Sequence, residues 1–255
     1  MLHLGDIKGA GSGARSRRPE AVAALDWPAR FAALAEAAQE PRLRAFYAAG
    51  AVAGDTPLAE VPMVAIDVET TGLDPARDEI VSIGLLPMTL ERIASSASRY
   101  WVVRPRIELS PESVVIHAIT HAQIEAAPDF GEIVDELLPA LAGCVVVVHC
   151  RDIERSFLDR ALKARIGEGI EFPVIDTMDL EARIHRAVRP GFFARLFGKK
   201  PETVSIRLAD SRARYRLPRY SAHHALTDAL ATAELLQAQV AHRFAPDTPL
   251  RELWS

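Results

Sequence analysis

The feature that most constrains the fold of this chain is residues 144–148, a run in which four consecutive valines follow a cysteine. It is the most hydrophobic stretch of the sequence. A strand that is apolar along its whole length, rather than at alternate positions, is typical of a strand buried on both faces of a sheet. We therefore expect residues 144–148 to form a central strand of an α/β sheet.

The segments around this run follow strand and helix patterns in a definite order. Compact apolar runs predict strands, and apolar residues three and four apart predict helices. The expected strands are residues 63–68, 79–87, 99–104, 144–148 and 172–176, and the expected helices are residues 128–141, 152–166 and 222–240. This order predicts a three-layer α/β domain with a mixed five-stranded sheet.

The chain of 255 residues is long enough for one large domain with an extension. The predicted division is a flexible tail at 1–22, a helical extension at 23–60, the main domain at 61–243 and a C-terminal tail at 244–255. In the extension, Asp26 and Pro28 are typical of the start of a helix, and Pro41 is expected to end it. A second short helix is expected to end at Gly50.

Composition and cysteine usage exclude several classes of protein. Hydrophobic residues make up 49% of the chain and charged residues 25%, which excludes a disordered or collagen-like protein. Cys144 and Cys150 form no C-x-x-C pair, so neither a zinc ribbon nor a disulfide framework is supported, and a reducing compartment is expected. No stretch approaches the roughly 18 apolar residues of a membrane helix. We expect a soluble, cytoplasmic protein that does not bind membranes.

Charge is distributed unevenly along the chain. The formal net charge is −4, which argues against a general binder of polyanions. Residues 183–219, however, carry eleven basic and two acidic residues, a net charge of +9 in a chain that is otherwise −13. Such a segment favours a phosphate backbone as its ligand, and a solvated loop is the other interpretation. We treat residues 183–219 as a basic insertion that guides a nucleic-acid strand.

Two acidic residues mark the first expected strand. Asp67 and Glu69 are two positions apart, and side chains two apart on a strand point to the same face. Their like charges repel unless a cation neutralises them. Oxygen ligands without a cysteine or histidine cluster favour Mg²⁺ or Mn²⁺ over zinc. Taken alone, the pair is equally consistent with two polar residues at a strand end.

Two further segments carry residues that fit the same chemistry. His223 precedes Asp228 by a little more than one helical turn, so the aspartate can join a metal cluster while the histidine reaches a water held there. The unperturbed pKa of histidine, about 6.5, suits removal of a proton at neutral pH. The other segment, residues 149–158, directly follows the central strand, and an acidic residue in its first helical turn would face the same sheet edge.

Together the three segments resemble the histidine-containing branch of the DEDD exonucleases, the family of the proofreading subunit of bacterial replicative polymerase. The first family motif, D-x-E-T-T-G-L, is matched without a departure, and the third, H-x-A-x-x-D, is also matched. The matching residues are Asp67, Glu69, Thr70, Thr71, Gly72, Leu73, His223, Ala225 and Asp228. Residues 116–120 are similar to the family's I-H-G-I-T segment, with alanine in place of glycine.

The second motif departs from the family pattern, H-N-x-x-F-D-x-x-F-L. Aligning His149 with its first position puts Glu154 at the metal-binding aspartate. Cys150 then stands at asparagine and Ile153 at phenylalanine. Asp152 is the competing candidate, on nearly the opposite side of the helix. We favour Glu154, because the residues on both flanks keep the family register.

The resemblance implies a ribonuclease H-like fold and a 3′–5′ exonuclease that releases nucleoside monophosphates. It also implies two Mg²⁺ or Mn²⁺ ions, with His223 taking a proton from the attacking water. The implied metal ligands are Asp67, Glu69, Glu154 and Asp228. The implied substrate contacts are Thr70, Thr71, Gly72, Leu73, His117, Thr120 and His149, with Leu73 wedged against the terminal base.

The expected substrate is a nucleic acid with a free 3′ end, with single-stranded DNA favoured. A polymerase or another replication or repair protein is an expected partner, and the sequence shows no polymerase domain of its own. One alternative is an RNA-trimming enzyme of the ribonuclease T or oligoribonuclease kind, because nothing in the sequence reads a 2′-hydroxyl. Another is a nucleic-acid-binding module whose site has decayed at Glu154. The intact residues of the first and third motifs argue against decay.

Overall fold

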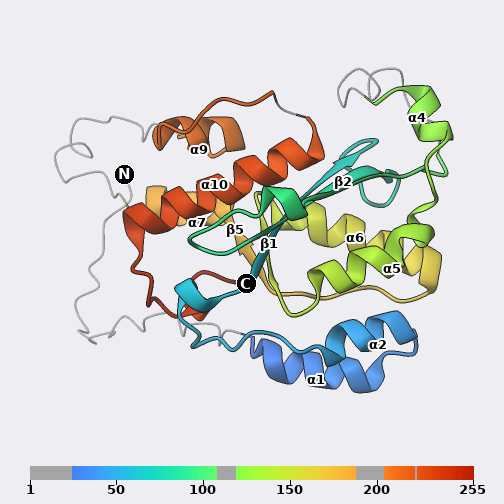
Figure 1. Cartoon of the computed structure of the whole chain (residues 1–255), viewed down its shortest axis with the longest axis horizontal. Helices are drawn as coiled ribbons and strands as arrows, with labels where there is room; N and C mark the ends of the chain where they lie inside the picture. The colour runs from blue at the N-terminus through green and yellow to red at the C-terminus, as the bar shows by residue number, and fades with distance from the viewer. Residues whose placement is uncertain (1–24, 108–118, 188–203, 222) are drawn as a thin grey trace, which may run out of the picture.

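The computed structural model describes residues 25–107, 119–187, 204–221 and 223–255 (Figure 1). The tail expected at 1–22 and the expected substrate contact His117 lie outside the described residues. So does much of the basic segment, residues 188–203.

A mixed five-stranded sheet forms the middle of the structure, as the sequence predicts. Its strands are β1 (Met63–Thr70), β2 (Ile80–Met88), β3 (Arg99–Val102), β4 (Val145–Val148) and β5 (Val174–Asp176), in the spatial order β3-β2-β1-β4-β5. β2 is antiparallel to both β1 and β3, whereas β4 is parallel to β1 and to β5. β3 is shorter than predicted, because the Arg104 N–H donates to the carbonyl oxygen of Pro128 and the chain turns away from β2.

Helices lie on both faces of this sheet, which makes the three layers that the sequence predicts. They are α1 (Trp27–Ala37), α2 (Pro41–Ala48), α4 (His121–Glu125), α5 (Phe130–Leu141), α6 (Arg151–Ile166), α7 (Thr177–Ala187), α9 (Leu208–Arg214) and α10 (Ala225–Arg243). α10 packs along β1 and β2 together with α7 and α9, and α5 packs with α6 on the other side (Figure 1). The sequence patterns did not predict α4, α7 or α9. No helix within the described ranges is both long and apolar enough to span a membrane.

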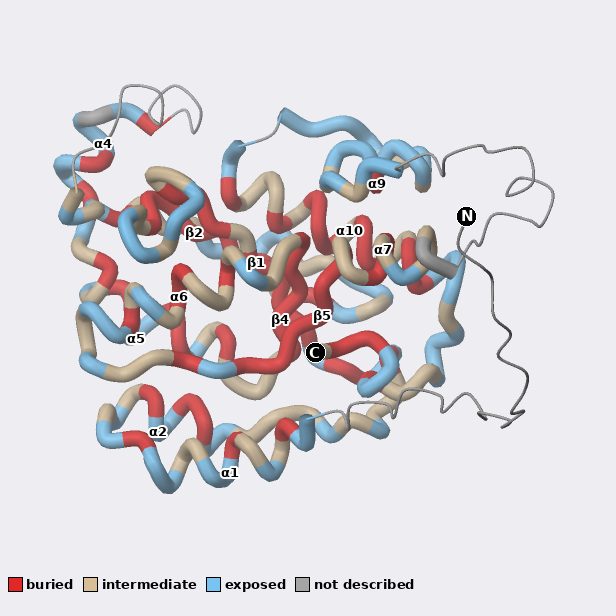
Figure 2. Tube along the Cα trace, turned by 180° about the vertical axis from the view of Figure 1, so that it is seen from behind, coloured by how far each residue is buried: buried red, intermediate tan, exposed pale blue. Residues whose placement is uncertain are grey.

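The predicted helical extension shares the core of the main domain. Phe31 of α1 and Tyr47 of α2 stack edge to face and belong to the same buried cluster as the sheet. Figure 2 shows buried stretches on α1, on α2 and along the strands. The hydroxyl of Tyr47 accepts a hydrogen bond from the backbone of Glu171, and the Glu168 carboxylate accepts from the backbone N–H groups between α1 and α2. Pro41 begins α2 as well as following α1. The domain boundary near residue 60 stays a prediction, and α1 and α2 pack as part of one core.

A single glycine lets α10 approach the sheet closely. Gly84 of β2 is paired with Asp67 of β1, at the place where the first turn of α10 crosses. A Cβ atom on Gly84 would lie 2.3 Å from the backbone of Ala225 and of Leu226. Glycine within a strand is typical of such a close backbone approach. The missing side chain therefore brings the N-terminal end of α10 next to Asp67.

Candidate active site

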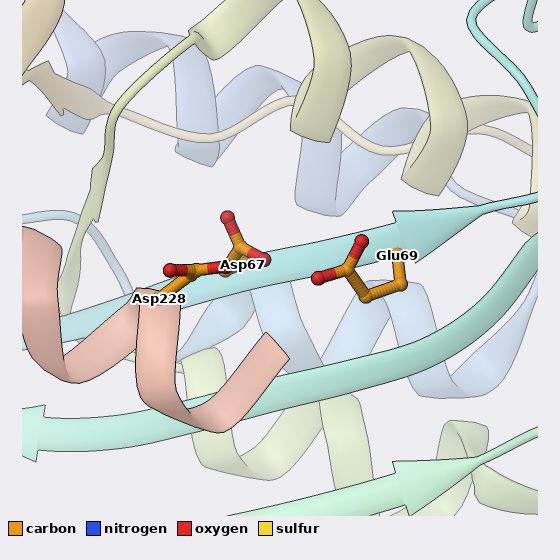
Figure 3. Close-up of side chains that lie close together, drawn as sticks. All are labelled: Asp67, Glu69 and Asp228. Carbon is orange, nitrogen blue, oxygen red and sulfur yellow. The ribbon is translucent and has the colours of Figure 1, made fainter. Parts of the chain in front are cut away.

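Three acidic side chains meet where the N-terminal end of α10 crosses β1 (Figure 3). Asp67, Glu69 and Asp228 each offer one carboxylate oxygen, and these oxygens all lie within 4.8 Å of one another. Asp67 and Glu69 share a face because they are two positions apart on β1. Asp228 joins them from the first turn of α10. Three of the four predicted metal ligands are thus brought together from distant parts of the chain.

Without a cation, the surroundings of this cluster disfavour three negative charges so close together. Burial raises the pKa of Asp67 well above its usual value, and the nearby carboxylates of Glu154, Glu69 and Asp228 raise it further. Burial also raises the pKa of Asp228, although hydrogen bonding from the His223 backbone acts in the opposite direction. A bound cation would favour the ionised form of each acid.

Glu154 is the fourth predicted metal ligand, and it lies outside the group of three. It lies in the first turn of α6 and is only 3% exposed, and its Oε2 atom has no hydrogen-bond partner among the described residues. Burial raises its pKa to about 8. The competing candidate Asp152 has a side chain that is 90% exposed and lies beside Arg151. The structure therefore places Glu154 near Asp67 and turns Asp152 toward solvent.

These residues fit a divalent cation with oxygen ligands. A buried carboxylate oxygen without a partner is costly unless something coordinates it. Asp67, Glu69 and Asp228 supply closely spaced oxygen atoms, and Glu154 supplies the unpartnered one, although it does not belong to the group within 4.8 Å. Hard oxygen donors of this kind match Mg²⁺ or Mn²⁺.

His223 lies just before α10 rather than within it. The sequence predicts a helix from residue 222, but α10 begins at Ala225 and residue 222 lies outside the described ranges. The φ angle of His223 is +70°, in the left-handed region that few non-glycine residues adopt. Its backbone N–H donates to Oδ2 of Asp228 at 2.8 Å, and its side chain is exposed. This backbone conformation keeps His223 beside the acidic cluster.

The neighbouring histidine has a different environment. The ring of His224 stacks on Tyr100 of β3, with centroids 4.7 Å apart and an interplanar angle of 17°. Its Nδ1 atom lies 3.5 Å from the hydroxyl of Thr227. His224 is therefore held against the edge of the sheet, and His223 is the histidine beside Asp228.

The turn after β1 carries the residues expected to border the terminal nucleotide. The Thr70 hydroxyl donates to the carbonyl oxygen of Gly72 at 2.5 Å, and the Thr71 hydroxyl donates to Asp78 at 3.0 Å. Leu73 follows with 81% of its surface exposed. The hydrogen bonds of this turn therefore present a large apolar side chain to solvent next to Glu69.

The other expected substrate contacts are placed differently. Thr120 is the N-cap of α4, where its side chain and that of Gln123 form a capping box. Both ring nitrogens of His149 lie at hydrogen-bond distance from protein groups, the Thr177 hydroxyl at 2.8 Å and the carbonyl oxygen of Ile206 at 3.0 Å. Burial lowers the pKa of His149, which favours a neutral ring. In this structure His149 connects the end of β4 to the segment before α9, and its contact with substrate stays a prediction.

The predicted basic surface is only partly a surface. The Arg183 side chain pairs with Asp179, the buried Arg212 pairs with Glu234, and Arg214 pairs with the buried Glu181. Among the arginines of this segment whose side chains the structure describes, Arg207, Arg216 and Arg219 are exposed and form no ion pair. The charges of Arg212 and Arg214 thus hold α7, α9 and α10 together. The strand-guiding role of residues 183–219 stays a prediction.

Gly84 is a residue of the site that the sequence analysis missed. It adds no chemical group, but its lack of a side chain sets the distance between β2 and α10. An isolated glycine inside a strand pattern is the signal that could have identified it.

The sheet order, the covering helices and the acidic cluster define a ribonuclease H-like α/β domain of the exonuclease class. The chain belongs to the Exonuclease family, whose model matches residues 64–236, and within it to the DEDDh-type 3′–5′ exonucleases. This confirms the family that the motifs predict. The matched region includes all four acidic residues and His223.

Several known proteins are similar over most of this chain. A DNA polymerase III subunit epsilon-like protein of Rhodobacter capsulatus is 30% identical over 181 residues, which are 71% of this chain and 24% of that protein. DNA polymerase III subunit epsilon of Treponema pallidum is 28% identical over 182 residues, 71% of this chain and 78% of that protein. Of the length of the first curated relatives that it matches, the Rhodobacter capsulatus protein among them, the chain spans about a quarter or less.

Solved structures show the same fold at lower identity. The nuclease domain of 3′hExo, a DEDDh family member bound to rAMP, superposes with a TM-score of 0.55 and 14% identity. The likeness covers 71% of this chain and 92% of that one.

Proposed function

We propose that this protein is a metal-dependent 3′–5′ exonuclease that hydrolyses single-stranded DNA to nucleoside monophosphates. The observation that carries the proposal is the gathering of Asp67, Glu69 and Asp228 within 4.8 Å, with the unpartnered oxygen of Glu154 buried nearby. Sites of this composition suit phosphodiester hydrolysis, in which charge develops on phosphate oxygens. Membership of the Exonuclease family supports the reaction class.

The four acidic residues would hold two divalent ions. When bound, such ions lower the pKa of water and neutralise charge on the attacking and leaving oxygens. The backbone N–H of His223 orients Asp228 through its hydrogen bond to Oδ2. This bond, together with the close approach at Gly84, fixes the geometry of the ligand set before substrate arrives.

The proton transfer is assigned to His223. Its exposed imidazole is the titratable group that accepts the proton of the attacking water, as its place beside Asp228 suggests. Water attacks the terminal phosphodiester, and the bond from phosphorus to the 3′-oxygen of the preceding nucleotide breaks. The products are a nucleoside 5′-monophosphate and a strand shorter by one nucleotide. Leu73 and the backbone of residues 70–72 would border the terminal nucleotide.

DNA is the favoured substrate, and a replicative polymerase is the favoured partner. The support is the similarity to proteins whose names place them in or near DNA polymerase III. The ribonuclease H-like core itself is compatible with either sugar, since none of the described site residues distinguishes a 2′-hydroxyl.

The proposal is tested with matched DNA and RNA strands that carry a label in the 3′-terminal nucleotide. With Mg²⁺ or Mn²⁺, we expect release of labelled monophosphate, faster from DNA. Asp67→Asn should lower the rate by about a thousandfold or more, because a metal-binding charge is lost.

The matched control is Asp152→Asn, which removes an exposed acidic residue of α6 and should leave the rate unchanged. Faster release from RNA would support the RNA-trimming alternative. Absence of cleavage of both strands with either metal would overturn the proposal.

A further inference from the structure

A pocket lies between α9 and α10, directly beside the acidic cluster. Its volume is about 330 Å³, and it is lined by α9, by residues 217–220, and by Asp228 and Ala231 of α10. A volume near 300 Å³ is at the lower end of the range of small-ligand sites and suits one nucleotide. Because Asp228 also belongs to the acidic cluster, the pocket borders the cluster.

Tyr220 forms an exposed aromatic wall of this pocket. It is one of four large hydrophobic side chains that are exposed in the described part of the chain, at 38%, and Leu73 is another. The guanidinium of Arg212 lies 4.7 Å from the centre of the Tyr220 ring, and the Tyr220 hydroxyl donates to Glu234 at 2.9 Å. The ring is therefore held in one orientation before any ligand binds.

Arg212 fixes the wall to α10. Its guanidinium donates to the carbonyl oxygens of Ala231 and Pro218 and to the Glu234 carboxylate, the last at 2.6 Å. These bonds join α9, the loop after it and α10 through one buried side chain. A preorganised aromatic ring loses little conformational entropy when a base stacks on it.

One exposed cation completes the pocket. Arg219 lines it and has no ion-pair partner among the described residues. The pocket also holds an acidic residue, Asp210, whose carboxylate accepts a hydrogen bond from the Ser205 hydroxyl at 2.5 Å. Arg219 is therefore the side chain available to a phosphate group.

The order of the site residues indicates which nucleotide enters. In Figure 3 Asp67 lies between Asp228 and Glu69, and the chain runs on from Glu69 to the turn that presents Leu73. A strand whose terminal nucleotide contacts Leu73, with its scissile phosphate at the acidic cluster, continues past Asp228. Its next nucleotide then reaches the pocket.

We propose that the pocket between α9 and α10 binds the nucleotide on the 5′ side of the scissile phosphate. Its base stacks on Tyr220, and its backbone phosphate contacts Arg219. This inference rests on the proposed exonuclease function. It assigns binding of the DNA strand to Tyr220 and Arg219, which are not metal ligands.

The test compares two substrates that differ only in the presence of this nucleotide. One is a single-stranded DNA oligonucleotide, and the other is the p-nitrophenyl ester of thymidine 5′-monophosphate, which has a scissile phosphate but no preceding nucleotide. Tyr220→Ala should lower kcat/KM for the oligonucleotide by roughly 5- to 100-fold, as expected for loss of base stacking. Its kcat/KM for the ester should stay within about twofold of wild type.

Three further variants make the result specific. Tyr220→Phe keeps the ring and should behave as wild type on both substrates, whereas Arg219→Gln should weaken only the oligonucleotide reaction. Val204→Ala removes another exposed hydrophobic side chain, in the segment before α9, that does not line the pocket, and should change neither reaction.

An equal loss on both substrates for Tyr220→Ala, or no loss on either, would overturn the inference. Failure of the wild-type protein to cleave either substrate would instead count against the proposed function. Unchanged ester hydrolysis also shows that the variant is folded.

Discussion

Glu154 is an acidic side chain that the protein buries without giving Oε2 a partner among the described residues. The raised pKa, to about 8, means that the surroundings favour the neutral acid when no cation is present. A neutral amide of the same size should therefore fit the site without loss of folding. This makes Glu154 a residue at which metal binding and stability can be separated.

For Glu154→Gln we expect Mn²⁺ binding to weaken by roughly 10- to 100-fold, since a charged ligand is replaced by a neutral one. The free energy of unfolding measured without metal should not fall. Calorimetric titration with Mn²⁺ measures the first quantity and urea unfolding the second. Asp152→Asn, on the exposed side of the same helix, should bind Mn²⁺ as wild type does. Equal Mn²⁺ affinity of Glu154→Gln and wild type would exclude Glu154 as a ligand.

At the scale of residues, the sequence predicted what depends on local periodicity. Asp67 and Glu69 had to share a face of a strand, and the register of α6 separated Glu154 from Asp152. The role of His149 could not be predicted, because its partner Ile206 is distant in sequence. The ion pairs of Arg212 and Arg214 could not be predicted for the same reason, since Glu234 and Glu181 lie on other helices.

The contact between α10 and β2 is the element-scale feature that assembles the site. α10 carries Asp228 and follows His223, and both are positioned only if its first turn reaches the sheet. At Gly84 the backbone of α10 is so close that no Cβ atom can be accommodated without movement. The close approach at Gly84 thus restricts the position of this end of α10 more than an ordinary helix–sheet contact does.

Gly84→Ala should push the first turn of α10 away from β1 and separate Asp228 from Asp67. We expect a loss of stability of about 1–3 kcal/mol from overpacking, and a loss of exonuclease rate of at least tenfold. Denaturant unfolding and the labelled-strand assay measure the two effects. Gly131→Ala is the control, because its Cβ would have a side-chain oxygen of Asp129, at 3.2 Å, as its nearest neighbour and would not overlap with backbone. A fully active Gly84→Ala protein would contradict this role for the glycine.

Whole elements were predicted where an apolar pattern specifies them. All five strands and the helices α5, α6 and α10 were expected, with ends displaced by a few residues. α9 was not, because Leu208 is its one large apolar residue and buried ion pairs of Arg212 and Arg214 hold it in place. A helix held by distant charges has no periodic signal in the sequence.

At the scale of the whole molecule, the helical extension and the catalytic domain are one packing unit. Phe31 is 2% exposed and contacts the rings of Trp27, Phe46 and Tyr47 in a cluster that continues into the sheet. The sequence predicts the extension as a small helical unit packed against the main domain, with a boundary near residue 60 where the pattern changes to strands. Shared burial is a property of the folded chain that such a change does not reveal.

Phe31→Ala should therefore destabilise the entire protein, by about 3–5 kcal/mol, and not α1 alone. Urea unfolding followed by circular dichroism and by loss of exonuclease activity should give one coincident transition at a lower midpoint. Glu36→Ala, at an exposed position of the same helix, should change the free energy of unfolding by less than about 0.5 kcal/mol. An early transition that leaves activity intact would show that the extension unfolds independently.

The acidic cluster joins β1 to α10, elements that are made at very different times during synthesis. A nascent polypeptide on the ribosome has Asp67 and Glu69 long before Asp228 emerges from the exit tunnel. Until then the nascent chain lacks part of the acidic ligand set, so a metal ion can be held by the whole cluster only after most of the chain has been made.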